Sequence, residues 1–242
     1  MFGVVLWDTT DDTPHPTIFI TRVIPAPQTR LSRRRMIRQQ VARRGIRDCR
    51  VLAALGWVPR EWFLAPKLTA HAYRDGPLPI GSGQTISQPY IVGLMTAGLA
   101  PRRTHRVLEV GTGSGYQTAV LAHLVAKVFT IERLPDLLVE AEERFRRLQI
   151  TNVETRLGDG ASGWPEEAPF DGIVVTAATP RVPAPLLDQV ARGGRLVAPI
   201  GDHDEQELVI LERLATGWRE QRMGGVRFVP LVSRLGFPED PW

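Results

Sequence analysis

The sequence of 242 residues contains a single cysteine and no long hydrophobic run. With Cys49 alone, no disulfide forms within the chain and no cysteine-based metal cluster can be built, so we predict no metal site. No apolar stretch approaches the roughly 20 residues that a helix needs to cross a bilayer. Residues 1–7 are apolar but short, and aspartates follow at once, whereas a secretory signal begins with basic residues and has a longer apolar stretch. These absences predict a cytoplasmic protein with no membrane partner.

The chain also carries only a small excess of positive charge. Its net charge is +4, and charged residues make up 23% of the sequence. Many arginines fall within residues 30–50, including Arg33, Arg34 and Arg35. Such a run suits either a nucleic-acid-binding arm or the solvated face of a helix. The small net charge and the lack of interleaved aromatic residues favour the helix face. We therefore predict no nucleic-acid partner.

The N-terminal part divides at about residue 30. Residues 1–30 hold Pro14, Pro16, Pro25 and Pro27, a density that prevents a continuous helix, so we expect an extension outside the core that is free to move. From residue 31 to about residue 64 the apolar spacing predicts two short helices broken near Gly45. A glycine-rich loop over residues 77–89 and an apolar helix over residues 90–99 follow.

Strands and helices alternate through the rest of the chain, with no internal repeat and no low-complexity tract. We predict buried strands at residues 107–110, 128–131, 153–157, 173–176 and 195–200, and helices at residues 117–124, 134–148 and 186–190. Residues 208–211 and 226–232 are predicted to close the sheet as an antiparallel pair. This alternation is typical of an α/β fold with a doubly wound, mostly parallel seven-stranded sheet. Residues 31–242 then form one domain, with helices and a loop over 31–100 and the sheet over 101–242.

A glycine loop, Gly111-Thr112-Gly113-Ser114-Gly115, ends the first of these strands. In open α/β sheets the ligand lies beyond the carboxyl ends of the strands, where the strand order reverses. Glycines there let the backbone turn tightly and approach a ligand without an intervening Cβ. The loop therefore predicts a ligand site at this end of the sheet.

Acidic residues end the next two strands and indicate the kind of ligand. Glu132 ends the second strand, where a carboxylate can accept hydrogen bonds from ribose hydroxyls, and Asp159 ends the third, where it can accept from an adenine amino group. Tyr116 stands where the third glycine of a dinucleotide fingerprint should be, and no phosphate loop for ATP is present. A nucleoside cofactor without phosphate fits best, and we predict S-adenosylmethionine.

The end of the fourth strand, residues 175–180, indicates what accepts the methyl group. It lacks the Asp/Asn-Pro-Pro-aromatic stretch expected for amino methylation of nucleic acids, and Cys49 is not set up as a nucleophile for cytosine C5. No histidine or lysine lies there to deprotonate a phenol or hydroxyl. The acceptor should therefore already be a nucleophile at neutral pH, as a carboxylate with a pKa of about 4 is.

Several stretches resemble the protein-L-isoaspartate O-methyltransferase family. Residues 72–75 leading into 78–90, Leu-Pro-Ile-Gly-Ser-Gly-Gln-Thr-Ile-Ser-Gln-Pro-Tyr, look like the family's signature loop. Residues 45–46, 58–61, 108–115, 158–160, 170–178, 193–196 and 227–231 continue the likeness, which covers roughly residues 34–232. Residues 191–192, Ala-Arg, depart from the commoner Lys-Pro, and residues 1–30 have no counterpart.

The resemblance implies methyl esterification of the free α-carboxylate of L-isoaspartyl residues in damaged proteins. The ester then collapses to a succinimide, whose opening returns some normal aspartate. Ser87 corresponds to the active-site serine. The implied cofactor-binding residues are Thr85, Ile86, Gly111, Thr112, Gly113, Gly115, Glu132, Arg133, Asp159 and Gly160. The implied substrate-binding residues are Ile80, Ser87, Thr176, Val229, Pro230 and Leu231.

Two other interpretations stay open at this point. Ser87 also suits a helix N-cap just before Pro89, because serine is a preferred cap and proline a preferred first-turn residue. The same fold and cofactor would equally serve an enzyme that esterifies aspartate in a biosynthetic peptide, and an RNA methylase that uses the arginines of residues 30–50 is the more distant alternative. We expect isoaspartyl proteins as partners and a monomer.

Residues 1–30 are predicted to be dispensable, because their prolines and lack of periodicity place them outside the core. A chain that begins near Leu31 should keep its methyltransferase activity and its melting temperature. Insolubility or loss of activity on truncation would show instead that the segment packs on the core.

Overall fold

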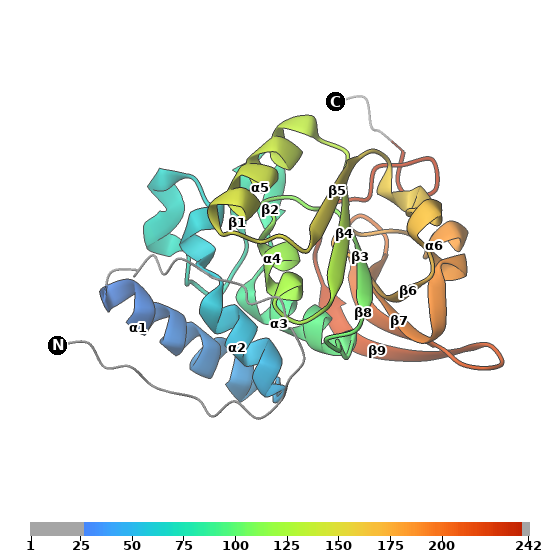
Figure 1. Ribbon diagram of the computed structural model, residues 1–242, viewed down its shortest axis with the longest axis horizontal. Helices are drawn as coiled ribbons and strands as arrows, with labels where there is room; N and C mark the ends of the chain where they lie inside the picture. The colour runs from blue at the N-terminus through green and yellow to red at the C-terminus, as the bar shows by residue number, and fades with distance from the viewer. Residues whose placement is uncertain (1–26, 239–242) are drawn as a thin grey trace, which may run out of the picture.

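The computed structural model describes residues 27–238 (Figure 1). Most of the predicted N-terminal extension, residues 1–26, lies outside the described residues. The predicted boundary at residue 30 falls inside a helix, because α1 spans Pro27–Met36. Pro27 stands at the first helical position, where its fixed φ suits a helix and its missing N–H costs nothing. Residues 27–30 are therefore helical and do not belong to the predicted extension.

The predicted break near Gly45 is confirmed. A π-helical turn over Ile37–Val41 and a 3-10 turn over Ala42–Arg44 follow α1, and the chain turns at Gly45 with φ of 100°. Asp48 then caps α2, Cys49–Trp57, by accepting from the backbone N–H groups of Arg50 and Val51. Two 3-10 helices, η3 (Arg60–Phe63) and η4 (Pro66–His71), lead to the signature loop.

The signature loop is a small hairpin. Strands β1 (Leu78–Gly81) and β2 (Gln84–Ile86) pair antiparallel around a turn at Ser82, and helix α3, Pro89–Gly98, follows within three residues. The turn residues Gly81, Ser82 and Gly83 all have positive φ, which two glycines allow at little cost. Residues 85 and 86 therefore lie in the second strand, and Ser87 lies in the short connection to α3.

The main sheet has seven strands in the order β5-β4-β3-β6-β7-β8-β9, which confirms the predicted fold class. The first five in this order run parallel, and β8 and β9 add antiparallel to β7. The strands are β3 (Arg106–Val110), β4 (Lys127–Glu132), β5 (Val153–Leu157), β6 (Phe170–Val175), β7 (Val190–Gly201), β8 (Gln206–Arg213) and β9 (Trp218–Val226). The connecting helices are α4 (Tyr116–Ala122), α5 (Pro135–Arg147) and α6 (Ala184–Asp188), with 3-10 turns at Gly160–Ser162 and Pro165–Glu167.

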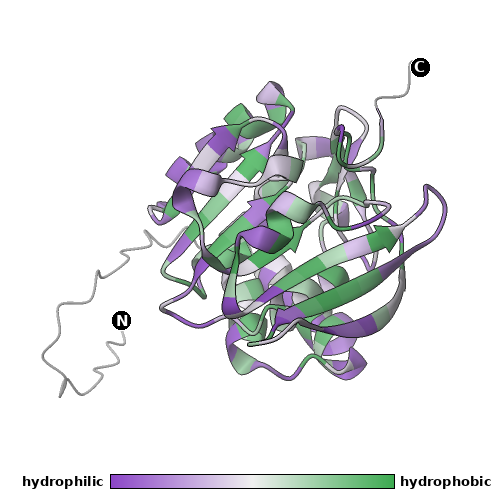
Figure 2. Cartoon of the chain, turned by 90° about the vertical axis from the view of Figure 1, so that its right-hand side faces the viewer, coloured by the Kyte–Doolittle hydropathy of each residue, from purple (hydrophilic) through white to green (hydrophobic). Residues whose placement is uncertain are grey.

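Two hydrophobic cores cover the two faces of this sheet. Val107, Val128 and Val174 face the core that α2, α3 and α4 close, whereas Leu108, Phe129 and Ile173 face the core beside α6. Residues that alternate along a strand thus serve opposite faces, because successive side chains point to opposite sides. Figure 2 shows the strands of the sheet as largely hydrophobic. Among residues 27–238 no helix combines the length and apolarity that crossing a membrane requires.

The last predicted strand is wrong in its position. Strand β9 ends at Val226, and residues 227–232 carry two isolated bridges, Pro230 with Ala178 and Val232 with Phe237, and no continuous strand. Leu231 donates its N–H to the Ala178 carbonyl at 2.7 Å, and Ala178 donates to the Val229 carbonyl at 2.8 Å. Pro230 has no N–H, so it cannot join a continuous ladder. The apolar run that suggested a strand is instead a segment laid against the end of β6.

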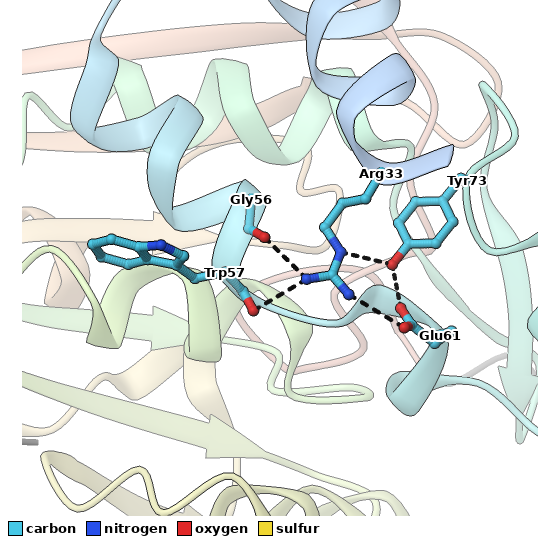
Figure 3. A network of polar contacts seen from close by, with 5 residues as sticks. All are labelled: Arg33, Gly56, Trp57, Glu61 and Tyr73. Carbon is cyan, nitrogen blue, oxygen red and sulfur yellow. Dashed lines mark hydrogen bonds and ion pairs between the residues drawn. The ribbon is translucent and has the colours of Figure 1, made fainter. Parts of the chain in front are cut away.

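The arginine run of α1 is only partly a solvated helix face. Arg34 and Arg35 are exposed, but Arg33 is buried and its guanidinium reaches across to α2 and η3 (Figure 3). It donates to the carbonyl of Gly56 at 2.9 Å, to the hydroxyl of Tyr73 at 2.9 Å and to the carboxylate of Glu61 at 3.2 Å. Tyr73 in turn donates to Glu61. Arg33 therefore joins α1 to the segment that leads into the signature hairpin.

Replacing Arg33 should destabilise the fold far more than replacing its neighbour. Arg33→Met leaves the half-buried Glu61 carboxylate without its cation, which costs about 2–4 kcal/mol of unfolding free energy. Arg34→Met, at an exposed position of the same helix, should change it by no more than about 0.5 kcal/mol. Urea unfolding of the two variants measures both values. Equal losses would mean that the network in Figure 3 contributes nothing specific.

Candidate active site

A cleft opens beyond the carboxyl ends of β3 and β6, where the strand order reverses. From β3 the chain adds β4 and β5 on one side, and β6 then pairs on the other side of β3. Loops that follow these two strands separate there and leave room for a ligand. We call this space the switch-point cleft. Of the predicted site residues it is lined by Thr85, Ile86, Ser87, Gly111, Thr112, Gly113, Glu132, Arg133, Asp159, Gly160, Thr176, Val229, Pro230 and Leu231.

Two predicted site residues, Gly115 and Ile80, are not in this lining. Gly115 has φ of 86°, and a Cβ there would lie 2.7 Å from Cε1 of Phe145 on α5. Its missing side chain thus lets α5 pack closely on the start of α4. Ile80, on β1, places its Cδ1 3.4 Å from where a Cβ on Gly113 would lie, so it borders the glycine loop.

Thr176, at the end of β6, holds the turn that follows β3. Its hydroxyl donates to the carbonyls of Val110 at 2.9 Å and Gly111 at 2.6 Å. A Cβ on Gly111, which has φ of 95°, would collide with this hydroxyl. The loop therefore needs glycine at position 111 for both its conformation and its contact with Thr176. Because the hydroxyl proton is engaged with carbonyls, Thr176 offers the cleft an acceptor.

Glu132, at the end of β4, is tied to the glycine loop and keeps its predicted position. One carboxylate oxygen, Oε2, accepts from the N–H of Gly113 at 2.8 Å, and Oε1 accepts from the N–H groups of Arg133 and Leu134 at 2.8 and 3.0 Å. A carboxylate has about four acceptor positions, so one remains for a hydroxyl donor in the cleft. The three bonds orient the group toward that donor.

Asp159, after β5, caps the short helix Gly160–Ser162 by accepting from the N–H of Ala161 at 2.9 Å. Its Oδ2 accepts from the hydroxyl of Ser233 at 2.7 Å, across a separation of 74 residues along the chain. The C-terminal segment thereby reaches the edge of the cleft at β5. The sequence carried no signal for this contact, because Ser233 lies in no recognisable motif.

Ser87 lies where the switch-point cleft meets a second, wider cleft of about 930 Å³, which we call the neighbouring cleft. Thr85, Thr176 and Val229 also line both spaces. The cap of α3 is Gln88, without a side-chain cap bond, so the N-cap interpretation of Ser87 is wrong. No hydrogen bond to the described part of the chain engages the Ser87 hydroxyl. It is thus available to a ligand at the junction.

Other residues of the lining were not anticipated from the sequence. They are Gln84, Val92, Met95, Val110, Tyr116, Gln117, Ile131, Leu134, Ala177 and Val232, and Ser114 of the glycine loop completes the lining. Most of these are apolar or lie on α3 and α4, where helical spacing indicates core residues equally well. Only the position of α3 beside the glycine loop brings Val92 and Met95 to the cleft.

A buried carboxyl lies directly beneath the glycine loop. Glu109 on β3 has no exposed surface, and burial raises its pKa to about 8. The hydroxyls of Thr118 and Thr130 both donate to its Oε2, whereas Oε1 has no partner within the described residues. An ionisable side chain is rarely buried so completely unless it has hydrogen-bond partners.

The fold is that of a Rossmann-like methyltransferase, with the switch-point cleft in the position that such folds use for a ligand. The model of the protein-L-isoaspartate (D-aspartate) O-methyltransferase family matches residues 31–236. Protein-L-isoaspartate O-methyltransferase 1 of Syntrophobacter fumaroxidans is 52% identical over 85% of this chain and 96% of its own length. The enzyme of that name from Methanoregula boonei is 54% identical over 85% of this chain and 94% of its own.

Solved structures agree with these relatives. A protein-L-isoaspartate O-methyltransferase superimposes with a TM-score of 0.75 at 28% identity, covering 84% of this chain and 67% of its own. A Plasmodium falciparum protein, described as a putative member and solved with S-adenosyl-L-homocysteine, gives 0.70 at 27% identity over 81% of this chain and 96% of its own. This chain belongs to the protein-L-isoaspartate (D-aspartate) O-methyltransferase family.

The Glu132 carboxylate should contribute directly to cofactor binding. Glu132→Ala removes a charged acceptor and also releases the N–H of Gly113, so S-adenosylhomocysteine should bind about 1.5–3 kcal/mol more weakly. Calorimetric titration measures the change. As a control, Glu143→Ala on the exposed side of α5, whose partner Arg146 is also exposed, should leave the affinity unaltered. Tighter binding of NAD than of S-adenosylhomocysteine by the unmodified chain would contradict the assignment of the cleft.

Proposed function

We propose that the chain transfers a methyl group from S-adenosylmethionine to the free α-carboxylate of L-isoaspartyl residues in proteins. The observation that carries this proposal is the junction at Ser87, where the two clefts share a rim. A cofactor in the switch-point cleft and a polypeptide in the neighbouring cleft would meet there. Family membership points to the same acceptor, since the relatives bear the name of that activity.

The lining fits S-adenosylmethionine, which supplies a methyl group on a positively charged sulfur. Along the sheet edge the carboxylates of Asp159 and Glu132 lie after β5 and β4, suited to the adenine amino group and the ribose hydroxyls. The glycine loop after β3 and Thr176 after β6 then face the amino-acid part and the sulfonium. Acceptors dominate this row, which suits a cationic ligand without phosphate.

The residues of the junction do not act as bases. An isoaspartyl carboxylate is already ionised at neutral pH, so its oxygen can form the new C–O bond while the C–S bond breaks, with no proton to remove. Negative charge on the carboxylate and positive charge on sulfur are both lost in this step. A partly desolvated cleft therefore favours the reaction over bulk water.

We propose that Ser87 donates a hydrogen bond to the oxygen of the isoaspartyl carboxylate that does not attack the methyl group. Charge leaves the attacking oxygen during the reaction, so a hydroxyl that donates to that oxygen would stabilise the ground state more than the transition state. Thr176 cannot share this duty, because its proton is engaged by the carbonyls of Val110 and Gly111. Ser87 and Thr85 remain as the hydroxyls of the junction, and the family resemblance assigns Ser87 to the carboxylate and Thr85 to the cofactor.

The remaining assignments follow the same proposal. We infer a cytoplasmic, monomeric enzyme that acts on damaged proteins and binds no nucleic acid. Arg33 is buried in a structural network, and Arg44 stacks on the ring of Tyr90 at 3.6 Å and pairs with Asp75 at 3.7 Å. Two of the arginines that suggested a nucleic-acid arm therefore hold the fold around the hairpin.

The substrate is tested by transfer of a tritiated methyl group to two peptides that differ only in an isoaspartyl or aspartyl linkage. Label should enter the isoaspartyl peptide and leave the aspartyl peptide at background. Equal labelling would favour the esterification of aspartate in a dedicated peptide. If neither peptide is labelled and the chain binds RNA in a salt-sensitive way, the result would favour an RNA methylase that uses the arginines of residues 30–50.

Ser87→Ala should lower kcat/KM by roughly 10- to 100-fold, the effect of losing one charge-assisted hydrogen bond. Much of the loss should appear in KM for the isoaspartyl peptide, with a smaller change in S-adenosylhomocysteine affinity. Ser82→Ala, in the turn of the same hairpin and outside both clefts, is the matched control and should keep full activity. A fall beyond a thousandfold that is confined to kcat would place the role of Ser87 in the transition state instead.

A further inference from the structure

A chain of hydroxyl groups connects the buried carboxyl of Glu109 to the switch-point cleft. Glu109 on β3 and Thr130 on β4 are register partners, and Thr130 donates to Oε2 of Glu109 at 2.7 Å. The hydroxyl of Thr130 also lies 2.7 Å from that of Thr112, in the glycine loop. Thr112 is 3% exposed and lines the cleft, whereas Glu109 and Thr130 have no exposed surface.

The Glu109 carboxyl group determines which hydroxyl donates in each hydrogen bond between Glu109, Thr130 and Thr112. A threonine hydroxyl has one proton and two lone pairs. Because Thr130 donates its hydroxyl proton to Glu109, the contact between the two threonines requires Thr112 to donate and Thr130 to accept. The proton of Thr112 then points away from the cleft, and only its lone pairs remain for a ligand.

The direction holds as long as Oε2 of Glu109 carries no proton. Both hydroxyls donate to Oε2, and Oε1 has no partner within the described residues, so the ionised carboxylate and a carboxyl protonated on Oε1 both leave Oε2 as an acceptor. Burial raises the pKa of Glu109, and a proton placed on Oε2 would instead donate to a threonine hydroxyl. The series of bonds therefore orients Thr112 in the states in which Oε2 accepts.

We propose that Glu109 and Thr130 are positioning residues that hold the Thr112 hydroxyl as an acceptor for the α-ammonium group of the cofactor's amino-acid part. This inference rests on the proposed function. An ammonium group has three donors and no acceptor, so it is matched by a lone pair and repelled by an outward hydroxyl proton. Thr112 lies after β3, beyond the ribose position at Glu132, which is where the amino-acid part would lie.

The test compares two ligands by calorimetry on the full chain. S-adenosylhomocysteine has the amino-acid part, and 5′-methylthioadenosine has the same nucleoside and sulfur without it. Thr130→Val should weaken the first ligand by about 5- to 20-fold, less than the loss of a whole hydrogen bond to a charged group, because the Thr112 hydroxyl remains. It should change the affinity of the second by less than about twofold. Thr112→Val should likewise weaken the first ligand selectively.

Two further variants separate orientation from packing. Thr118→Val removes the other hydroxyl that donates to Glu109, which is outside the path to Thr112, so S-adenosylhomocysteine should bind as in the unmodified chain. Thr130→Ser keeps the hydroxyl and should restore the affinity that Thr130→Val loses. Melting temperatures of all variants establish that each one is folded under the conditions of the titration.

The contrary outcomes are distinct. If Thr130→Val weakens the binding of both ligands equally, the residue supports the loop as a whole and the inference is wrong. The inference is also wrong if Thr118→Val weakens S-adenosylhomocysteine binding as much as Thr130→Val does. A loss in Thr112→Val without one in Thr130→Val would also overturn it, because Thr112 would then need no orientation. If the unmodified chain binds no S-adenosylhomocysteine, the proposed function itself is wrong.

Discussion

The close approach of two turns, one after β3 and one after β6, is the constraint on which the rest of the site depends. Thr176 bonds to the carbonyls of Val110 and Gly111, and position 111 has room for no side chain. This contact fixes the start of the glycine loop relative to β6. The loop in turn presents the N–H of Gly113 to Glu132, so the residues after three different strands are aligned through backbone bonds. A cleft built in this way needs little rearrangement to orient a ligand.

The polar groups beneath the loop are arranged at the expense of simple hydrophobic packing. Glu109 and its threonines occupy positions where aliphatic residues would pack without a desolvation cost. Arg60 is similar: it is fully buried, it donates to the carbonyl of Ala72 at 2.8 Å and its guanidinium lies over the ring of Tyr116. Burial lowers its pKa to about 10, so it still carries its charge at neutral pH. Both groups border the start of α4, Arg60 through the ring of Tyr116 and Glu109 through the hydroxyl of Thr118.

The N-terminal helices position the half of the site that the sheet cannot provide. Arg33 joins α1 to Tyr73 and Glu61, and Gln40 donates to the carbonyl of Tyr73 at 2.9 Å. Tyr73 directly precedes the segment that leads into the hairpin, so these contacts support the hairpin that carries Ser87. The two halves of the site thus come from different layers of the domain, and their meeting depends on the packing of α3 between hairpin and sheet.

The sequence by itself determined the alternation of strands and helices, the glycine loop and the acidic residues that end β4 and β5. These are local patterns, because hydrophobic periodicity and turn chemistry act over a few residues. It also determined the family, through the loop that contains Ser87. It did not determine that residues 227–232 leave the sheet to lie against Ala178, or that Arg33 is buried while Arg34 is exposed. Nor did it reveal the path from Glu109 to Thr112 or the bond between Ser233 and Asp159. Each of these joins residues that are distant along the chain, and only the tertiary structure decides which distant groups meet, because their local sequences are compatible with many partners.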